Sequence, residues 1–296
     1  MEKEKSGNAA RLPRRPYGSK GIELSIVGVG GISISEMEQE RSNRIVSEAV
    51  EKGVNYFDVA PTYGNAEQRM GPALKPYRKN VFLACKTTER KREGAQAELI
   101  QSLERLQTDY LDLYQLHAIK DVEKDVDVAF GPGGAMEVFI EAKKSGQVRH
   151  LGFSAHSEAA ALAAMERYDF DSALFPVNFA TMLKNNFGYE VISKAREKGV
   201  SILALKSLAR QEWPRGDNRR SEYPKCWYQP VTEKEEAKLA MAYTLAQPVT
   251  ALVPPGDPGL CQWAIDLGLE LEPLTKEGKE QLAALSSGLN PLFPRV

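Results

Sequence analysis

Apolar runs of strand length alternate with amphipathic stretches of helix length along most of this chain. Most of the apolar runs contain consecutive Val, Ile, Leu and Phe residues, which is typical of parallel strands buried on both faces. The expected strands are Leu24–Val29, Val54–Asp58, Val81–Lys86, Tyr110–His117, Val148–Ser154, Ser172–Val177, Val200–Lys206 and Val249–Pro254. The expected helices are Glu38–Lys52, Ala66–Pro76, Ala95–Leu106, Ala135–Lys144, Ser157–Arg167, Gly188–Lys198, Thr232–Ala246, Pro258–Leu267 and Thr275–Ser287.

Several expected helices end at a glycine that is followed almost at once by a strand, as at Gly53, Gly146 and Gly199. Glycine favours the left-handed conformation that commonly ends a helix. Eight such strand–helix units predict an α/β protein with a closed (β/α)8 TIM barrel. A doubly wound sheet is the alternative. It is disfavoured because the segment from Gly28 to Gly31 lacks the full G-x-G-x-x-G pattern of dinucleotide-binding sheets.

The length of 296 residues allows either two ordinary domains or one barrel of about 250 residues. No stretch has the composition of a domain linker, and no repeat exceeds the β–α unit, so we expect a single domain. Residues 1–20 are basic and contain proline, which indicates an N-terminal arm or hairpin before a barrel at residues 21–296.

Charge and cysteine content exclude several classes of protein. The 39 Lys and Arg residues balance 40 Asp and Glu residues, so neither nucleic acid nor an anionic membrane surface is expected as a partner. No apolar run approaches the roughly 18 residues of a membrane helix, which predicts a soluble chain. Cys85, Cys226 and Cys261 form no C-x-x-C pair, so we expect no disulfide framework and no metal site. A reducing cytoplasm is the expected compartment.

Several expected strands end in a polar residue, among them Asp58, Lys86 and His117, and Tyr63 follows Asp58 in the next loop. In a barrel these positions converge on one pocket. Each residue alone has an ordinary structural explanation, such as a helix cap, a solvated lysine or ring packing. Together they suit proton transfer to a carbonyl oxygen, because a nearby ammonium stabilises a tyrosine phenolate and a carboxylate holds that ammonium in place. A neutral histidine would orient the carbonyl.

Four segments carry a resemblance to a known family: Gly53–Gly64, Ala84–Thr87, Ser102–His117 and Gly146–Ser154. They read GVNYFDVAPTYG, ACKT, SLERLQTDYLDLYQLH and GQVRHLGFS, and in order and spacing they resemble the aldo-keto reductase family. The resemblance implies a (β/α)8 barrel, an NAD(P)H cofactor extended across the barrel mouth, and reduction of an aldehyde or ketone to an alcohol, or the reverse. It makes Tyr63 the proton donor, with Lys86 and Asp58 tuning it and His117 orienting the carbonyl.

The segments expected to bind the cofactor depart from the family pattern. Ser154 is followed by Ala155 instead of asparagine, and Leu174 stands where the family has glutamine. No Lys or Arg occurs between Val253 and Leu271, where the family usually supplies a cation for the 2′-phosphate of NADP, and Asp257 is acidic. We therefore expect a divergent member that favours NAD(H) over NADP(H). The residues expected at the cofactor are Gly30, Gly31, Ser154, Asn178, Lys206, Ser207, Leu208, Gly256 and Asp257.

The long connection Ala209–Val231 contains aromatic residues and several arginines. Because long loops after barrel strands usually carry function, Trp213, Trp227 and Tyr228 are predicted to line the pocket for a small-molecule substrate. Packing of the loop on itself is the alternative. Arg210, Arg215, Arg219 or Arg220 could restore a clamp for the 2′-phosphate.

Two alternatives to a carbonyl reductase stay open. One is a redox-neutral sugar-modifying enzyme with tightly bound NAD, which catalyses elimination or epimerisation. The other is a regulatory barrel without catalysis.

Overall fold

The computed structural model describes residues 10–19 and 21–293. Its parallel strands lie in chain order around a single sheet, so that each strand pairs with the one before it. They are β3 (Val29–Gly30), β4 (Tyr56–Asp58), β5 (Phe82–Thr87), β6 (Leu111–Ile119), β7 (Val148–Ala155), β8 (Ser172–Pro176), β9 (Ser201–Leu205) and β12 (Ala251–Val253).

The sheet closes on itself between its first and last strands. Val27, just before β3, pairs in parallel with Leu252 of β12. The Gly28 amide donates to the Leu252 oxygen and the Leu252 amide donates to the Ile26 oxygen, both at 2.9 Å. The predicted (β/α)8 TIM barrel is therefore confirmed.

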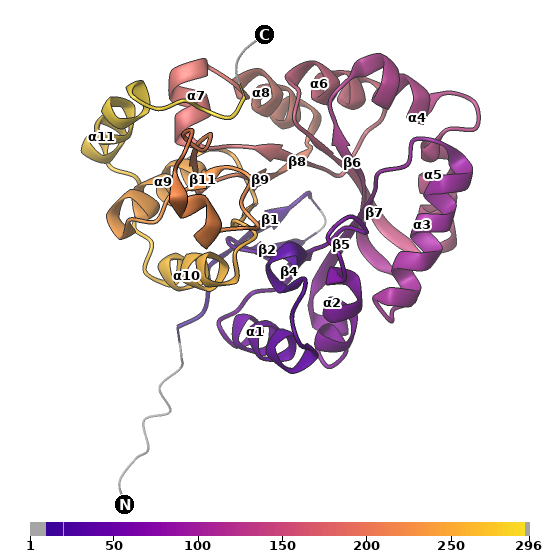
Figure 1. Ribbon diagram of the computed structural model, residues 1–296. Coiled ribbons are helices and arrows are strands. Elements are labelled where there is room, and N and C mark those ends of the chain that lie inside the picture. Colours follow the sequence, from indigo (N-terminus) through magenta and orange to yellow (C-terminus); the bar gives the residue numbers. More distant parts are fainter. Residues whose placement is uncertain (1–9, 20, 294–296) are drawn as a thin grey trace, which may run out of the picture.

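Helices surround the strands on all sides (Figure 1). The main ones are α1 (Gln39–Glu51), α2 (Ala66–Leu74), α3 (Arg92–Arg105), α5 (Ala135–Ser145), α6 (Glu158–Arg167), α8 (Tyr189–Lys198), α9 (Lys234–Ala246), α10 (Pro258–Leu269) and α11 (Lys276–Ser287). Most of them bury apolar residues on one side, as α1 does with Ile45, Val46 and Ala49, whereas α11 packs on α7 (Phe179–Asn185) and α9. The predicted glycine caps after α5 and α8 are present, because Gly146 and Gly199 have φ angles of +86° and +70°.

Several short elements were not predicted from the sequence. They are α7 (Phe179–Asn185), α4 (Val128–Phe130), the helical turns Gly31–Ile34, Arg78–Asn80, Val122–Asp127 and Asn218–Glu222, and the antiparallel pair β10 (Ala209–Gln211) and β11 (Gln229–Pro230). Most of them lie in connections that follow barrel strands. No helix in the described part of the chain is both long and apolar enough to cross a membrane.

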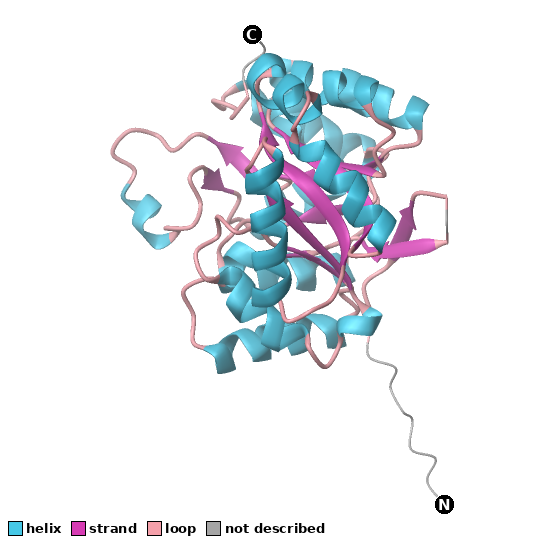
Figure 2. Cartoon of the chain, turned by 90° about the vertical axis from the view of Figure 1, so that its right-hand side faces the viewer, coloured by secondary structure: helices cyan, strands magenta, loops and turns pink. Residues whose placement is uncertain are grey.

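An antiparallel hairpin of β1 (Arg14–Tyr17) and β2 (Ile22–Ser25) precedes the barrel. The Tyr17 ring is buried at 4.8 Å from the Phe82 ring, and its hydroxyl donates to Ser172 Oγ at 3.0 Å. Since Phe82 and Ser172 begin their strands, the hairpin covers the amino-terminal end of the barrel. Figure 2 shows the hairpin at the end of the barrel opposite the long 209–231 loop.

The predicted strand Leu24–Val29 is wrong as a single element. Leu24 and Ser25 belong to the hairpin, and the barrel strand begins only at Val29. Both parts are apolar because both face the barrel interior or its wall, so periodicity alone could not separate them. The division of the chain at residue 20 stays a prediction, and residues 1–9 and 20 lie outside the described residues.

Candidate active site

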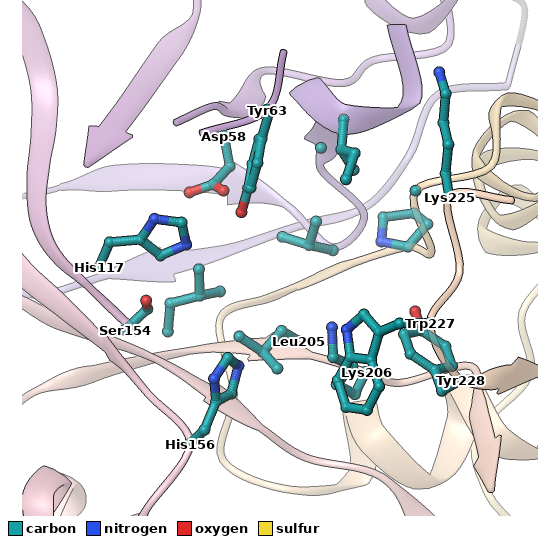
Figure 3. Close-up of a pocket in the computed structure, with 16 residues that line it drawn as sticks. Asp58, Tyr63, His117, Ser154, His156, Leu205, Lys206, Lys225, Trp227 and Tyr228 are labelled. Carbon is teal, nitrogen blue, oxygen red and sulfur yellow. The ribbon is translucent and has the colours of Figure 1, made fainter. Parts of the chain in front are cut away.

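A pocket of about 240 Å³ opens at the carboxyl ends of the barrel strands (Figure 3). This is the end of a (β/α)8 barrel where catalytic residues gather. The polar and aromatic side chains that line it are Asp58, Tyr63, His117, Ser154, His156, Lys206, Lys225, Trp227 and Tyr228. Within the described residues, no group of three or more His, Cys, Asp or Glu side chains is placed to hold a metal ion.

An ion pair between Lys86 and Asp58 lies at the base of this pocket and is buried. Lys86 Nζ also donates to the Val59 oxygen at 3.0 Å, while Asp58 Oδ2 accepts from Gln115 Nε2 at 3.0 Å and from the Tyr56 hydroxyl at 3.3 Å. Burial by itself lowers the pKa of Lys86, but the Asp58 carboxylate, with smaller contributions from Tyr63 and Cys85, outweighs burial, so the pKa lies above its usual value. Lys86 is therefore a fixed cation.

Tyr63 stands between this ion pair and the pocket. Its ring centroid is 5.3 Å from Lys86 Nζ, and its hydroxyl points into the cavity (Figure 3). A turn from Ala60 to Tyr63, followed by Gly64 with a φ angle of +58°, gives the ring this position. Burial raises the pKa of Tyr63, and the Lys86 ammonium opposes that rise. The hydroxyl is therefore protonated at neutral pH, and the cation beside it would stabilise the phenolate left after proton donation.

His117 faces Tyr63 edge to face, with ring centroids 5.7 Å apart. Burial, and next the charge of Lys86, lower the pKa of His117 to about 2, so its ring is neutral at physiological pH. Its Nδ1 atom is buried and has no hydrogen-bond partner in the described structure. A neutral imidazole here can donate one N–H to an oxygen in the pocket.

The structure thus brings together Asp58, Tyr63, Lys86 and His117, as the sequence analysis expected. Sequence reasoning missed Gln115 and Tyr56, which hold the second carboxylate oxygen of Asp58. A signal for Gln115 was present, because it is a polar residue inside an apolar strand and pairs in register with Lys86.

The residues expected at the cofactor divide into two groups. Gly30, Ser154, Lys206 and Gly256 line the pocket. The other members do not line it: Gly31, Asn178, Ser207, Leu208 and Asp257.

Residues 26–287, most of the chain, match the model of the aldo/keto reductase family. The chain belongs to the aldo/keto reductase family. Aldo-keto reductase YhdN of Bacillus subtilis is 29% identical over 237 residues, which cover 69% of this chain and 67% of that protein. Uncharacterized oxidoreductase YqkF of Bacillus subtilis is 33% identical over 157 residues, or 48% of this chain and 49% of that protein, so the chain spans about half the length of YqkF in this match.

Solved structures of the family share this fold. The holo form of aldo-keto reductase AKR11C1 from Bacillus halodurans is 24% identical, with a TM-score of 0.72 over 93% of this chain and 96% of that chain. At this level of identity the similarity supports the barrel itself and not a particular substrate.

The barrel mouth has unused polar groups that fit the dinucleotide of this family. Asn178 Oδ1 accepts from the Thr181 amide and begins α7, but Asn178 Nδ2 is buried without a partner in the described structure. Ser207 Oγ is likewise buried and unpartnered. These two residues follow the adjacent strands β8 and β9, at whose carboxyl ends the pocket opens, although neither residue lines the pocket itself.

Asp257, in the segment after β12, was expected at the cofactor, but the structure gives it a different role. The Asp257 carboxylate accepts from the Leu260 amide at 2.9 Å and begins α10, so it serves as a helix cap. At Gly256 a Cβ atom would lie 2.7 Å from Ile32 Cγ2, so this close approach needs a glycine. The cap therefore places a carboxylate at the start of α10.

Lys225 is a pocket residue that the sequence analysis did not single out. Its Nζ atom donates to the Ser35 oxygen at 2.6 Å, which ties the long loop to the segment after β3. Two of the loop arginines are engaged elsewhere, since Arg210 pairs with Glu236 and Arg219 pairs with Asp217. The loop therefore brings a lysine, and not these arginines, to the pocket.

The three aromatic residues predicted for the substrate wall lie in different places. Trp227 and Tyr228 line the pocket with ring centroids 5.3 Å apart, and Trp227 is 55% exposed to solvent. Trp213 is not among the lining residues, and its indole N–H donates to the Cys226 oxygen at 2.8 Å. Trp213 thus packs the loop onto itself, which was the alternative reading for this group.

Proposed function

We propose that this protein is an oxidoreductase that reduces an aldehyde or ketone to an alcohol with NAD(P)H, or catalyses the reverse reaction. The observation that carries the proposal is the approach of Tyr63 and His117 to one pocket in front of the buried Lys86–Asp58 pair. A protein that only binds ligands has no need of a buried cation behind a tyrosine hydroxyl. We therefore favour an enzyme over a regulatory barrel.

The residues act on the proton and on the orientation of the substrate. A bound reduced nicotinamide supplies a hydride to the carbonyl carbon. Tyr63 donates its hydroxyl proton to the carbonyl oxygen, and the Lys86 ammonium stabilises the phenolate that remains. Asp58 keeps Lys86 charged and in place. Neutral His117 donates an N–H to the same carbonyl oxygen, which orients the carbonyl toward Tyr63.

We propose that Gly30, Ser154, Asn178, Ser207 and Gly256 hold the dinucleotide at the barrel mouth, and that NAD(H) is favoured over NADP(H). The support is the pair of unpartnered polar groups after β8 and β9 and the acidic cap at the start of α10. The partner is a small molecule. We also propose a cytoplasmic location, because the three cysteines are unpaired and buried.

Substitution of Tyr63 by phenylalanine tests the assignment of the proton donor. Tyr63→Phe should lower kcat by roughly 100- to 10,000-fold, the usual contribution of general acid catalysis, because it deletes the donor and little else. The affinity for NADH, titrated by quenching of tryptophan fluorescence, should stay within about twofold of the parent. A variant that keeps near-parental kcat on several aldehydes would refute the assignment.

A further inference from the structure

The ladder between β6 and β7 is irregular at His117. Between two successive pairs of this ladder, β6 carries two residues, His117 and Ala118, whereas β7 carries only Ser154. Such a bulge interrupts the hydrogen bonds of the ladder at the extra residue. Ala118 has a φ angle of +53°, a left-handed conformation that is unfavourable for a residue with a Cβ atom and persists where contacts fix it. The peptide unit between His117 and Ala118 therefore needs partners outside the regular ladder.

Two side chains hold this peptide unit, one at each end. The Ala118 amide donates to Ser154 Oγ at 2.7 Å, and the backbone oxygen of His117 accepts from Arg90 Nη2 at 2.6 Å. The bond from Arg90 is charge-assisted, and such bonds are stronger than those between neutral groups. Because a peptide unit is planar, these two bonds also fix the Cα atom of His117, from which the imidazole extends toward Tyr63 (Figure 3).

Arg90 is itself fixed by further contacts of its guanidinium. It donates to the backbone oxygens of Thr87 and Thr88, at 3.4 and 3.0 Å. It also pairs with Asp125 at 3.0 Å, and the Asp125 carboxylate accepts from two backbone amides of the loop after β6, at 2.7 and 3.0 Å. Since Thr87 directly follows Lys86, one side chain joins the strand end that carries the buried cation to the strand end that carries the histidine.

The backbone around Arg90 is held as well, and its side chain lies behind the pocket. The Ala135 amide donates to the Arg90 oxygen at 3.0 Å, and Lys91 forms an antiparallel bridge with Gly134. Only 13% of the Arg90 side chain is exposed, and Arg90 is not among the residues that line the pocket. Any influence of Arg90 on a molecule in the pocket must therefore pass through the groups that it holds.

We propose that Arg90 is a positioning residue, which holds His117 where its imidazole donates to the carbonyl oxygen of the substrate. This inference rests on the reductase function proposed above, because it gives Arg90 a purpose through the role of His117 there. Groups that take part in a reaction have to be held within about 0.5 Å of their productive positions by their neighbours. At His117 regular pairing with β7 is interrupted, and the bond from Arg90 supplies that restraint.

A double-mutant cycle between Arg90 and His117 tests whether Arg90 acts through the histidine. Arg90→Met should lower kcat for a neutral aldehyde about 10- to 100-fold, the worth of one charge-assisted hydrogen bond. The KM for the aldehyde and the Kd for NADH should change less than about threefold. In a His117→Ala background the same substitution should lower kcat by less than about twofold, because the group that Arg90 positions is gone. Arg90→Lys keeps a cation and a donor and should recover most of the loss.

Two further variants complete the cycle. Arg92, two residues farther along, makes partly exposed ion pairs with Glu137 and Glu141, so Arg92→Met is a matched control and should keep kcat within about twofold. Asp125→Asn loosens Arg90 without removing it, and it serves if Arg90→Met does not fold. It should lower kcat about threefold, the worth of a neutral hydrogen bond, and again only when His117 is present.

Nuclear magnetic resonance of the free protein gives a readout that needs no substrate. Burial is the main cause of the low pKa of His117, so a ring released into solvent should titrate near its ordinary pKa of about 6.5. The imidazole resonances of His117 are identified by their loss in His117→Ala. They should not titrate between pH 5 and 8 in the parent or in Arg92→Met, and they should titrate in this range in Arg90→Met.

Three results would overturn the proposal. They are a parental kcat in Arg90→Met, an equal loss of kcat from Arg90→Met with and without His117, and a His117 ring that still does not titrate above pH 5 in Arg90→Met. A parent protein that reduces no carbonyl compound would instead refute the reductase function. The resonance titrations would then still decide whether Arg90 holds the imidazole in the pocket.

Discussion

Replacement of Lys86 by methionine separates the structural role of the buried ion pair from its catalytic role. In Lys86→Met the Asp58 carboxylate keeps only neutral partners, Gln115 Nε2 at 3.0 Å and the Tyr56 hydroxyl at 3.3 Å. Removing one member of a buried pair costs about 3–5 kcal/mol, because the other charge is left uncompensated. We expect the free energy of unfolding to fall by about that amount. Adding Asp58→Asn removes the stranded charge and should restore most of the loss.

Catalysis should respond differently. At the 5.3 Å between Lys86 Nζ and the Tyr63 ring centroid, an effective dielectric constant of about 20 gives an attraction of about 3 kcal/mol between ammonium and phenolate. That energy corresponds to about two units in the pKa of Tyr63 and to as much as a hundredfold in kcat. Because the second substitution does not replace the cation, the double variant should be as inactive as Lys86→Met.

Urea unfolding followed by circular dichroism gives the stabilities, and NADH oxidation with a neutral aldehyde gives kcat. A double variant no more stable than Lys86→Met would refute the account of the ion pair. A double variant that regains parental kcat would refute the role of Lys86 in stabilising the phenolate.

Three further predictions concern the pocket and its pH response. Trp227→Ala should raise KM about fivefold and change kcat less than twofold, because a half-exposed ring loses about 1 kcal/mol of apolar contact; equal KM values across several substrates would remove Trp227 from the pocket. NAD(H) should bind at least as tightly as NADP(H) in fluorescence titrations; tenfold tighter NADP(H) binding would contradict this, and its loss in Lys225→Met would identify the responsible cation. Because the pKa of His117 is about 2, the log of kcat/KM should show no inflection from this residue between pH 5 and 7. Its depressed pKa means that stability is present above pH 6.5 and lost on acidification. His117→Asn should therefore reduce the difference in unfolding free energy between pH 7 and pH 5, measured in urea, by about 2 kcal/mol, because only the pH range below the unfolded pKa of 6.5 contributes, at about 1.4 kcal/mol per unit.

The order of elements and the catalytic group could be predicted from sequence because both are local signals. A barrel strand is a continuous apolar run, and its last polar residue, such as Lys86 or His117, marks the carboxyl end. The family resemblance supported the same residues as the catalytic group. The pattern of apolar residues did not distinguish Leu24, which belongs to the hairpin, from Val29, which belongs to the barrel.

The contacts that complete the site depend on packing between distant segments, and the sequence could not show them. Lys225 reaches the pocket only because its loop folds back across the mouth and bonds to Ser35. As a tryptophan in the long loop, Trp213 suited the substrate wall as well as Trp227 did. In the structure its indole N–H instead donates to the Cys226 oxygen within the same loop. Loop aromatics have no periodicity that fixes their direction.

The barrel closes through the pairing of Val27 with Leu252, which lie near opposite ends of the chain. During synthesis, Asp58, Lys86 and His117 emerge from the ribosome long before the strand that completes the ring. Until β12 arrives, the edges of β3 and β9 are open and can pair with other strands. The pocket also spans the junction between β3 and β12, because Gly30 lines it from one side and Gly256 from the other. A nascent chain that lacks β12 and α10 therefore holds the proton-transfer residues without an enclosed site, and it is at this stage most exposed to aggregation.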